Sequence, residues 1–411
     1  MNERERMLAC LRGEPTDQLP WAPRMDLWSI AQQARGTMPE RFKGMNTAQI
    51  ADELGVGCHA VRADWTIIPQ LDRDPRDFMW RAFGFETCWD FPFKLEINSL
   101  KVDFKYEAGE GSGKYWTTIH TPAGPLETYM EYENSMAKNR ITAPEIKQYV
   151  LPDPTNWEAV AQVYEAFEVV PTPENYRAFR DRIGDRGLAL AQGPNSASPM
   201  HSILHMLMPM EAFFYAYMDV PDELHKLAER ITPFFDRILD VMCECDAEVV
   251  WWGANYDQST TWPPFFAKEI VPYVRMVGDR LRAAGKYMAS HCDGENDKLL
   301  EYMPTARFDI AESVPTEPMV KCSLKELREG FGEPTTVWGG LPAVAFMDGP
   351  MPDDSFEAHM DRVFGELGSG KRLILGVSDN VPVDALISRL EKVTERVKAF
   401  GPVNPAPAGQ L

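Results

Sequence analysis

The second half of the chain alternates short apolar runs with longer amphipathic stretches. The apolar runs are bounded by Gly, Pro, Asn, Asp or Ser and occupy 187–194, 247–253, 286–294, 308–313, 335–340 and 373–380. Short runs of this kind are typical of buried strands. The stretches between them carry apolar residues at helical spacing, as Leu224, Leu227 and Ile231 do. This half of the chain therefore predicts alternating strands and helices.

The N-terminal part continues the same alternation. A helix is predicted to end at Gly13, and strands are predicted at 19–28 and 59–65, with a helix at 47–55 between them. Along the whole chain, about eight strand-like runs are each followed by a helical pattern, which is the signature of an α/β protein of the (β/α)₈ barrel type.

Residues 85–135 have a different composition, rich in Trp, Phe, Tyr and Thr. The segments WTTIHT and LETYME flank a turn at 122–124 and predict a β-hairpin. We interpret this region as a β-meander inserted into the barrel rather than as a separate domain. We therefore expect a single domain over 1–401, followed by a flexible, Pro-rich tail at 402–411.

Composition narrows the classes of function. The chain has 62 acidic and 42 basic residues, a net charge of −20, which argues against a nucleic-acid partner because phosphates require a basic surface. No apolar run is long enough to predict a membrane-spanning helix, and the N-terminus does not resemble a signal peptide. We therefore expect a cytoplasmic protein without a membrane partner. The seven cysteines include no CxxC pair, so no zinc knuckle is expected.

Polar side chains follow many of the predicted strands, and barrel enzymes carry catalytic groups at these strand ends. The candidates are Arg24, Asp26, Asp64, Asn255, Asp257, His291, Cys292, Asp293, Glu312, Ser378 and Asp379.

Four of these candidates have metal-ligand character, namely His291, Asp293, Glu312 and Asp379. Because alternate strand residues face the same side, His291 and Asp293 can share one ion and Cys292 cannot. Histidine with carboxylates suits zinc, or a harder ion such as iron(II) or manganese. The alternative is a hydrogen-bonded barrel histidine with aspartates that cap loops.

Aromatic residues cluster in and after the strand predicted at 247–253. They are Trp251, Trp252, Tyr256 and Trp262. They form either ordinary core or a pocket for a methoxy-arene or a quaternary ammonium, which aromatic faces attract. His201 and His205 share one helix face, but no HExxH motif is present, so a core or pocket-wall role is expected for them.

Several segments together resemble the uroporphyrinogen decarboxylase superfamily, and within it the corrinoid-dependent methyltransferases. They are RERMLACLRGEPTDQLP (4–20), TPAG (121–124), WWGANYDQST (251–260), EIVPYVRMVGDRLRAAGKYMASHCDG (269–294), FDIAES (308–313) and GVSDNVPVDALISRLEKV (376–393). The resemblance covers nearly the whole chain and implies a barrel of this superfamily's type.

The resemblance also implies a ligand set. Methyltransferases of this kind hold zinc with a His-x-Cys pair and a distant cysteine. His291 takes the histidine position, Asp293 the first cysteine, and Asp379 or Ser378 the second, with Glu312 as a fourth or outer ligand. Replacing thiolates by carboxylates implies an oxygen- or nitrogen-bearing substrate, polarised by the metal as a Lewis acid.

The resulting hypothesis is a demethylase component that moves a methyl group from a small O- or N-methylated compound to a corrinoid. Because the chain has no DxHxxG motif, the corrinoid would be carried by a partner protein. The sequence specifies neither the methyl donor nor the oligomeric state, and a homodimer is compatible with it. Catalytic roles are expected for Asn255, Tyr256 and Asp257, and substrate-binding roles for Arg24, Asp26, Trp252 and Trp262.

Two alternatives stay open. The first is a decarboxylase of uroporphyrinogen or of a smaller carboxylate, in which Asp26 or Asp257 stabilises a protonated intermediate. Uroporphyrinogen itself is disfavoured, because the stretch WAPRMDLWS offers only Arg24 to hold many carboxylates. The second alternative is a subunit without catalytic activity that binds a corrinoid protein.

Overall fold

The computed structural model describes residues 1–61, 74–85 and 91–403. Its central feature is a curled parallel sheet with the strand order β1-β8-β9-β10-β11-β12-β13. The strands are β1 (Cys58–Ala60), β8 (Gly187–Gln192), β9 (Val249–Ala254), β10 (Tyr287–His291), β11 (Ile310–Val314), β12 (Thr336–Pro342) and β13 (Leu373–Ser378). The order of these strands across the sheet is the same as their order along the chain.

The segment around Trp21 closes the sheet between its two edge strands. The Ala22 N–H donates to the carbonyl of Leu375 on β13 (2.9 Å), and the Gly57 N–H, just before β1, donates to the carbonyl of Trp21 (2.8 Å). This segment takes the place of an eighth strand and closes the barrel. The strand predicted at 19–28 is nevertheless too long, because Pro20 and Pro23 have no N–H for a ladder.

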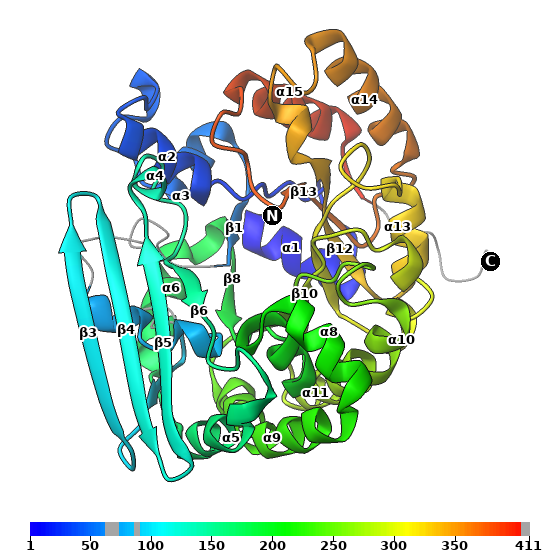
Figure 1. Cartoon of the computed structure of the whole chain (residues 1–411). Coiled ribbons are helices and arrows are strands. Elements are labelled where there is room, and N and C mark those ends of the chain that lie inside the picture. The colour runs from blue at the N-terminus through cyan, green and yellow to red at the C-terminus, as the bar shows by residue number, and fades with distance from the viewer. Residues whose placement is uncertain (62–73, 86–90, 404–411) are drawn as a thin grey trace.

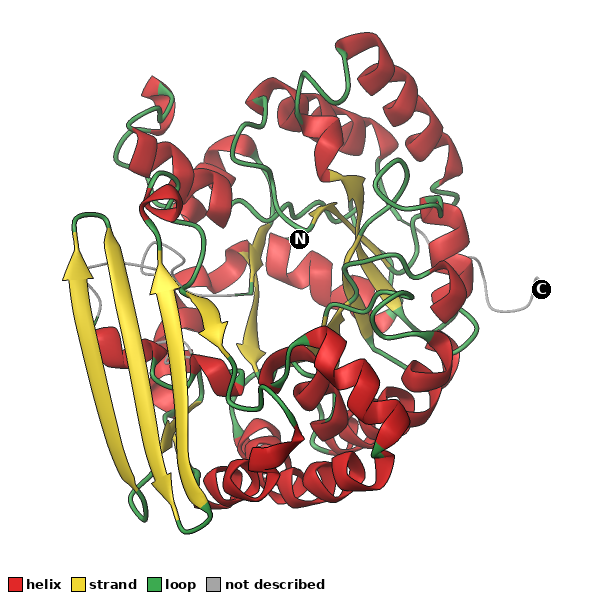
Figure 2. Cartoon of the chain, in the orientation of Figure 1, coloured by secondary structure: helices red, strands yellow, loops and turns green. Residues whose placement is uncertain are grey.

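Helices surround the sheet, as Figures 1 and 2 show. They are α1 (Glu3–Arg12), α2 (Asp26–Arg35), α3 (Thr47–Leu54), α5 (Trp157–Ala166), α6 (Pro173–Ile183), α7 (Pro199–Ser202), α8 (Met210–Asp219), α9 (Pro221–Glu244), α10 (Pro263–Phe265), α11 (Val271–Ala283), α12 (Met303–Ala306), α13 (Leu324–Phe331), α14 (Asp353–Glu366) and α15 (Ile387–Phe400). None of the described helices has the length and apolar composition needed to cross a bilayer.

The N-terminal helix closes one end of the barrel. Helix α1 ends at Gly13, as predicted, and its apolar residues pack with the barrel interior. The side chain of Arg372, just before β13, donates to the Leu11 carbonyl, and Arg4 pairs with Glu248 just before β9. Helix α1 therefore covers the amino ends of the strands, which leaves their carboxyl ends for a site.

The predicted β-meander is present between β1 and β8. Strands β3 (Lys101–Gly109), β4 (Ser112–Thr121), β5 (Gly124–Tyr132) and β6 (Glu145–Gln148) form an antiparallel sheet, and its three long strands stand together to one side of the barrel in Figure 1. A small ladder of β2 (Phe93–Glu96) and β7 (Glu168–Pro171) joins it to the rest, and α4 (Asn134–Ala137) lies between β5 and β6. The predicted hairpin is confirmed, with Trp116 opposite Tyr129.

Side chains alternate between the two faces of the barrel wall. Trp251, Ala289 and Trp338 lie in the interior cluster, whereas Trp252 and Cys292 pack on the side that faces the helices. His291 is two residues beyond Ala289 and therefore points to the interior. Asp64, the second half of the strand predicted at 59–65, and residues 404–411 of the predicted tail lie outside the described residues.

Candidate metal centre

His291 and Glu312 form the centre of the site. They end neighbouring strands and stand opposite each other in the parallel register of β10 and β11. The Nδ1 of His291 lies 2.6 Å from Oε2 of Glu312, and both side chains are buried. This bond fixes the plane of the imidazole. The other ring nitrogen, Nε2, then faces Asp379 at the end of β13.

Asp379 completes the group from the end of β13. Its Oδ1 lies 3.7 Å from Nε2 of His291, and it accepts hydrogen bonds from Arg24 (3.2 Å) and from the Ser313 hydroxyl (3.1 Å). Asn380 donates to its other oxygen over 2.8 Å. Ligand atoms of His291, Glu312 and Asp379 all lie within 4.8 Å of one another, so these three residues could hold a metal ion.

The charges of these groups are strongly coupled. Burial alone would lower the pKa of His291, but the charges of Glu312 and Asp379 outweigh it and raise that pKa to about 9. Burial opposes ionisation of Glu312 as well, yet His291 and His59 lower its pKa below the usual range. For Asp379, the charges of Arg24 and His291 overcome burial and lower the pKa. Both carboxylates are therefore ionised at neutral pH.

Asp293 follows the last residue of β10 by two positions and lies outside the compact group of three. Burial raises its pKa, and the nearby charges of Asp379 and Glu312 raise it further against the opposing effect of His291. Ser378 is buried, and its hydroxyl donates to the Val314 carbonyl over 2.5 Å. Of the two alternatives at the end of β13, Asp379 is therefore the residue that offers a ligand atom.

His59 is the residue that the sequence analysis missed. It lies on β1, with Nε2 2.9 Å from Oε1 of Glu312, and its ring stacks on Trp338 at 4.0 Å and 25°. His59 Nε2 and Glu312 Oε1 thus form a close contact that becomes an ion pair when the ring is protonated, and Nδ1 of His59 has no hydrogen bond among the described residues. The strand predicted at 59–65 placed its polar end at Asp64, outside the described residues, whereas His59 lies within β1 (Cys58–Ala60) and faces the centre from there.

Catalytic roles were predicted for three residues of the loop after β9. Two of them, Tyr256 and Asp257, have structural roles instead. Tyr256 is fully buried, and its hydroxyl bonds Ser290 over 2.8 Å. The carboxylate of Asp257 accepts the backbone N–H groups of Ser259 and Glu295, and although burial opposes it, these bonds lower its pKa. Asn255 is exposed, and its backbone N–H donates to the His291 carbonyl.

The two predicted substrate-binding tryptophans lie elsewhere. Trp252 is fully buried and donates to the Ala197 carbonyl, so it has no surface to offer a ligand. Trp262 packs against Phe265 at 4.7 Å in a cluster outside the barrel wall. The tryptophan that contacts the centre is Trp251, which stacks on His291 at 4.8 Å and 23°.

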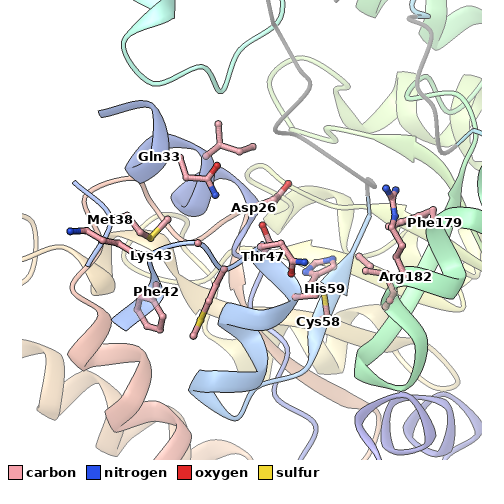
Figure 3. A pocket seen from close by; sticks show the side chains of 17 residues that line it. Asp26, Gln33, Met38, Phe42, Lys43, Thr47, Cys58, His59, Phe179 and Arg182 are labelled. Atoms are coloured by element: carbon pink, nitrogen blue, oxygen red, sulfur yellow. The ribbon is translucent and has the colours of Figure 1, made fainter. Parts of the chain in front are cut away.

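Arg24 and Asp26 connect the centre to a cavity. Arg24 is buried between Asp26 and Asp379 and binds both. Asp26, together with His59, lines a cavity of about 640 Å³ bounded by α2, α3, β1 and α6. Figure 3 shows the labelled side chains of Asp26, Thr47 and His59 close to one another in the middle of this cavity wall. The wall that holds Asp26 and His59 therefore borders the candidate metal centre.

This architecture, an α/β barrel with ionisable groups gathered at the carboxyl ends of its strands, is that of barrel enzymes. Residues 128–400 match the family described as Uroporphyrinogen decarboxylase (URO-D), and the chain belongs to this family. Among solved structures, it is similar to a methyltransferase from Methanosarcina mazei, with a TM-score of 0.57 and 16% identity over 97% of this chain and 99% of that one. At this identity the likeness shows a shared fold. No curated protein matches the chain.

Proposed function

We propose that this protein is a metal-dependent methyltransferase of the uroporphyrinogen decarboxylase superfamily. The observation that carries the proposal is the group formed by His291, Glu312 and Asp379, whose ligand atoms lie within 4.8 Å of one another at the barrel mouth. The family match and the fold of the methanogen methyltransferase support the class of enzyme.

The residues present fit a divalent ion. His291 Nε2 and Asp379 Oδ1 are 3.7 Å apart, a span that two ligand bonds of about 2 Å each can bridge. The other oxygen of Glu312, Oε1, is buried and lies 2.9 Å from Nε2 of His59 without forming a well-aligned hydrogen bond, so a bound cation would further compensate this buried charge. One nitrogen with carboxylate oxygens suits zinc, iron(II) or manganese.

Each neighbouring side chain has a defined task in this proposal. Glu312 orients the imidazole through Nδ1, as carboxylates commonly do behind a metal-bound histidine. Arg24 and Ser313 hold Asp379 in place. Trp251 covers the ring of His291 and excludes water from it. Asp293, half-buried just after β10, is a further carboxylate that could bind the ion. A bound ion would supply Lewis-acid polarisation of the methylated heteroatom.

The methyl acceptor that we propose is a corrinoid on a separate protein. Three features support it: the chain carries no corrinoid-binding DxHxxG motif, its sequence segments resemble corrinoid-dependent methyltransferases, and the neighbour in fold is named a methyltransferase. The carboxylate ligands favour an O- or N-methylated donor, since these ligands are harder than thiolates.

The test combines metal analysis with methyl transfer. Purified protein should contain about one divalent ion per chain, and His291→Ala should lose it while His120→Ala, on the exposed strand β4, keeps it. With a reduced corrinoid protein and a methylated donor, the wild type should transfer the methyl group and His291→Ala should not. Metal-free protein that transfers methyl groups at the wild-type rate would contradict the proposal.

A decarboxylase is the second candidate, and Arg24 is the observation in its favour. This buried guanidinium lies between Asp379 and Asp26, which itself lines the cavity, and it could bind a substrate carboxylate that displaces one of these partners. The same ion pairs also balance the charges of the site without an ion. Release of carbon dioxide from a carboxylate substrate by chelator-treated protein would favour this candidate over methyl transfer.

A further inference from the structure

We propose that His59 is a positioning residue of the metal centre. Its imidazole holds the second oxygen of the Glu312 carboxylate, and Glu312 in turn orients the ring of His291. His59 therefore acts on a bound metal through another side chain and does not bind the metal itself. The inference rests on the proposed function, because it assigns a role at that same centre. It adds a residue of β1 to a site otherwise built on β10, β11 and the end of β13.

The carboxylate of Glu312 lies between two imidazole rings. Its Oε2 is 2.6 Å from Nδ1 of His291, and its Oε1 is 2.9 Å from Nε2 of His59. The terminal torsion of a glutamate side chain is broad, so a contact at one oxygen alone would leave the carboxylate free to turn. Contacts at both oxygens fix its plane. The direction in which His291 presents its Nε2 therefore depends on His59 as well as on Glu312.

His59 reaches this carboxylate across the interior of the barrel. It lies on β1, and strands β8, β9 and β10 separate β1 from β11 in the sheet. Its buried ring stacks on Trp338, which is opposite Glu312 in the register of β11 and β12. The Nε1 of Trp338 donates to the Ala22 carbonyl over 3.1 Å. His59 is thus held beside Glu312 by a tryptophan whose own orientation is fixed.

The two histidines are supported in the same way. Trp251 stacks on His291 at 4.8 Å and 23°, and Trp338 stacks on His59 at 4.0 Å and 25°. Stacking restricts the ring torsion of a histidine, which is otherwise broad. The carboxylate of Glu312 is therefore enclosed by two rings that cannot easily turn away from it. Support of this kind preorganises a metal ligand before the ion binds.

The other edge of the His59 ring supports a role directed at Glu312. Its Nδ1 has no hydrogen bond among the described residues, so the contact with Glu312 is the polar contact that this part of the chain gives the ring. A nitrogen lone pair 2.9 Å from a carboxylate oxygen would be repelled, and Nε2 therefore has to carry a proton. The role requires an N–H group at the Nε2 position of this side chain.

Two neutral amides separate this role from simple filling of space. Glutamine can place its amide nitrogen where Nε2 of the ring lies, whereas asparagine places its amide nitrogen where Nδ1 lies. Both side chains are smaller than the ring, and neither carries a charge. His59→Gln should therefore keep the contact with Oε1 of Glu312, and His59→Asn should lose it.

Zinc binding to the full-length protein tests the inference, with affinities measured by competition against a chelator of known affinity. His59→Gln should stay within about twofold of the wild type, whereas His59→Asn and His59→Phe should weaken zinc about tenfold, the lower end of the effect of losing an outer partner of a ligand. His359→Phe is the matched control on α14, because His359 is 6% exposed and His59 is 7% exposed. It should leave the zinc affinity unchanged.

Cobalt(II) in place of zinc adds a readout of ligand geometry, because its visible absorption bands depend on the number and arrangement of the ligands. The wild type and His59→Gln should have the same spectrum, and the bands of His59→Asn should shift or broaden. A residue that supports only the fold would lower the free energy of unfolding and leave the bands of the folded, metal-loaded protein unchanged. Circular dichroism would show that each variant is folded.

A double substitution tests whether His59 acts through Glu312. In Glu312→Ala, the further change His59→Asn should cause little additional loss of zinc affinity, because the carboxylate that His59 holds is already gone. Additive losses would show that His59 acts independently of Glu312 and would overturn the inference. The comparison of His59→Gln with His59→Asn stands even where the bulkier His59→Phe does not fold.

Failure of the inference and failure of the proposed function would look different. Wild-type zinc affinity in His59→Asn, or equal losses in His59→Gln and His59→Asn, would overturn the inference and leave the proposed function standing. A metal site that depends on His59 in a protein without methyl transfer from O- or N-methylated donors would support the inference and overturn the proposed function. Wild-type protein that binds neither zinc nor cobalt would overturn both.

Discussion

The Nδ1 of His291 and the Oε2 of Glu312 lie 2.6 Å apart across two neighbouring strands, and this contact directs the Nε2 of the same ring toward Asp379. The parallel register of β10 and β11 sets this pairing, because the two residues are opposite each other. A backbone ladder thus orients a side chain that can bind a metal, and the orientation does not depend on any loop.

Glu312→Gln tests this orientation. The amide can still contact Nδ1, but it removes the negative charge that holds the N–H toward it and that favours a bound cation. Metal affinity should fall about 10- to 100-fold, the usual effect of losing an outer carboxylate. Titration against a chelator of known affinity would measure it, with circular dichroism to show that the fold is kept. Wild-type affinity in Glu312→Gln would contradict the role assigned to this carboxylate.

Arg24 should stabilise the fold through its two carboxylate partners. Arg24→Met leaves Asp26 and Asp379 close together without their buried cation, and should lower the free energy of unfolding by about 3 kcal/mol. Urea denaturation would measure the loss. In Arg24→Met with Asp379→Asn, part of the loss should be recovered, because the uncompensated charge is gone. Strictly additive effects of the two substitutions would show that the pair is not coupled.

The stacked rings of His201 and His205 predict a pH dependence of stability. Burial lowers the pKa of His205 to about 4, below the ordinary value near 6.5. Between these two values the unfolded chain binds a proton that the folded chain does not, so stability is complete above pH 6.5 and is lost as pH falls toward 4.

His205→Gln should therefore flatten the pH dependence of the unfolding free energy between pH 6.5 and 4 by on the order of 2 kcal/mol. Chemical denaturation at a series of pH values would measure it. The same slope in wild type and His205→Gln would refute this assignment.

The hairpin of the meander should contribute to stability and not to the site. Trp116 and Tyr129 are cross-strand partners whose rings stack at 5.1 Å and 20°. Trp116→Ala should lower the free energy of unfolding by about 1 kcal/mol, as expected for an aromatic pair on a sheet, while metal affinity stays as in the wild type. Denaturation and metal titration of the same preparation would test both parts.

The barrel and the position of His291 could be predicted from sequence because both follow from periodic patterns. Apolar runs that end in polar residues mark strands and their carboxyl ends, and strand alternation separates His291 from Cys292, which the structure buries on the outer side of the wall. The same reasoning named Asp379 as a candidate ligand, and the family resemblance left the choice between Asp379 and Ser378 open. The strand pattern and the position of His291 can be recognised from residues that are close together in the sequence or from family motifs.

The rest depends on contacts between distant segments, for which the sequence carries no local signal. His59 reaches Glu312 because β1 is short and lies at the far side of the barrel, some 250 residues away in the chain. Trp252 and Tyr256 belong to an aromatic cluster that suggested a pocket, but both are buried in the core, where they bond Ala197 and Ser290. The cavity between α2, α3 and α6 arises from packing alone.

The measurement that tests the central claim most directly is X-ray absorption at the edge of the bound metal, with the wild type and His291→Ala compared. The account predicts one imidazole nitrogen and carboxylate oxygens at about 2.0–2.2 Å, no sulfur, and loss of this signal in the variant. A sulfur ligand at about 2.3 Å, or a spectrum that His291→Ala leaves unchanged, would contradict a centre built from His291, Glu312 and Asp379.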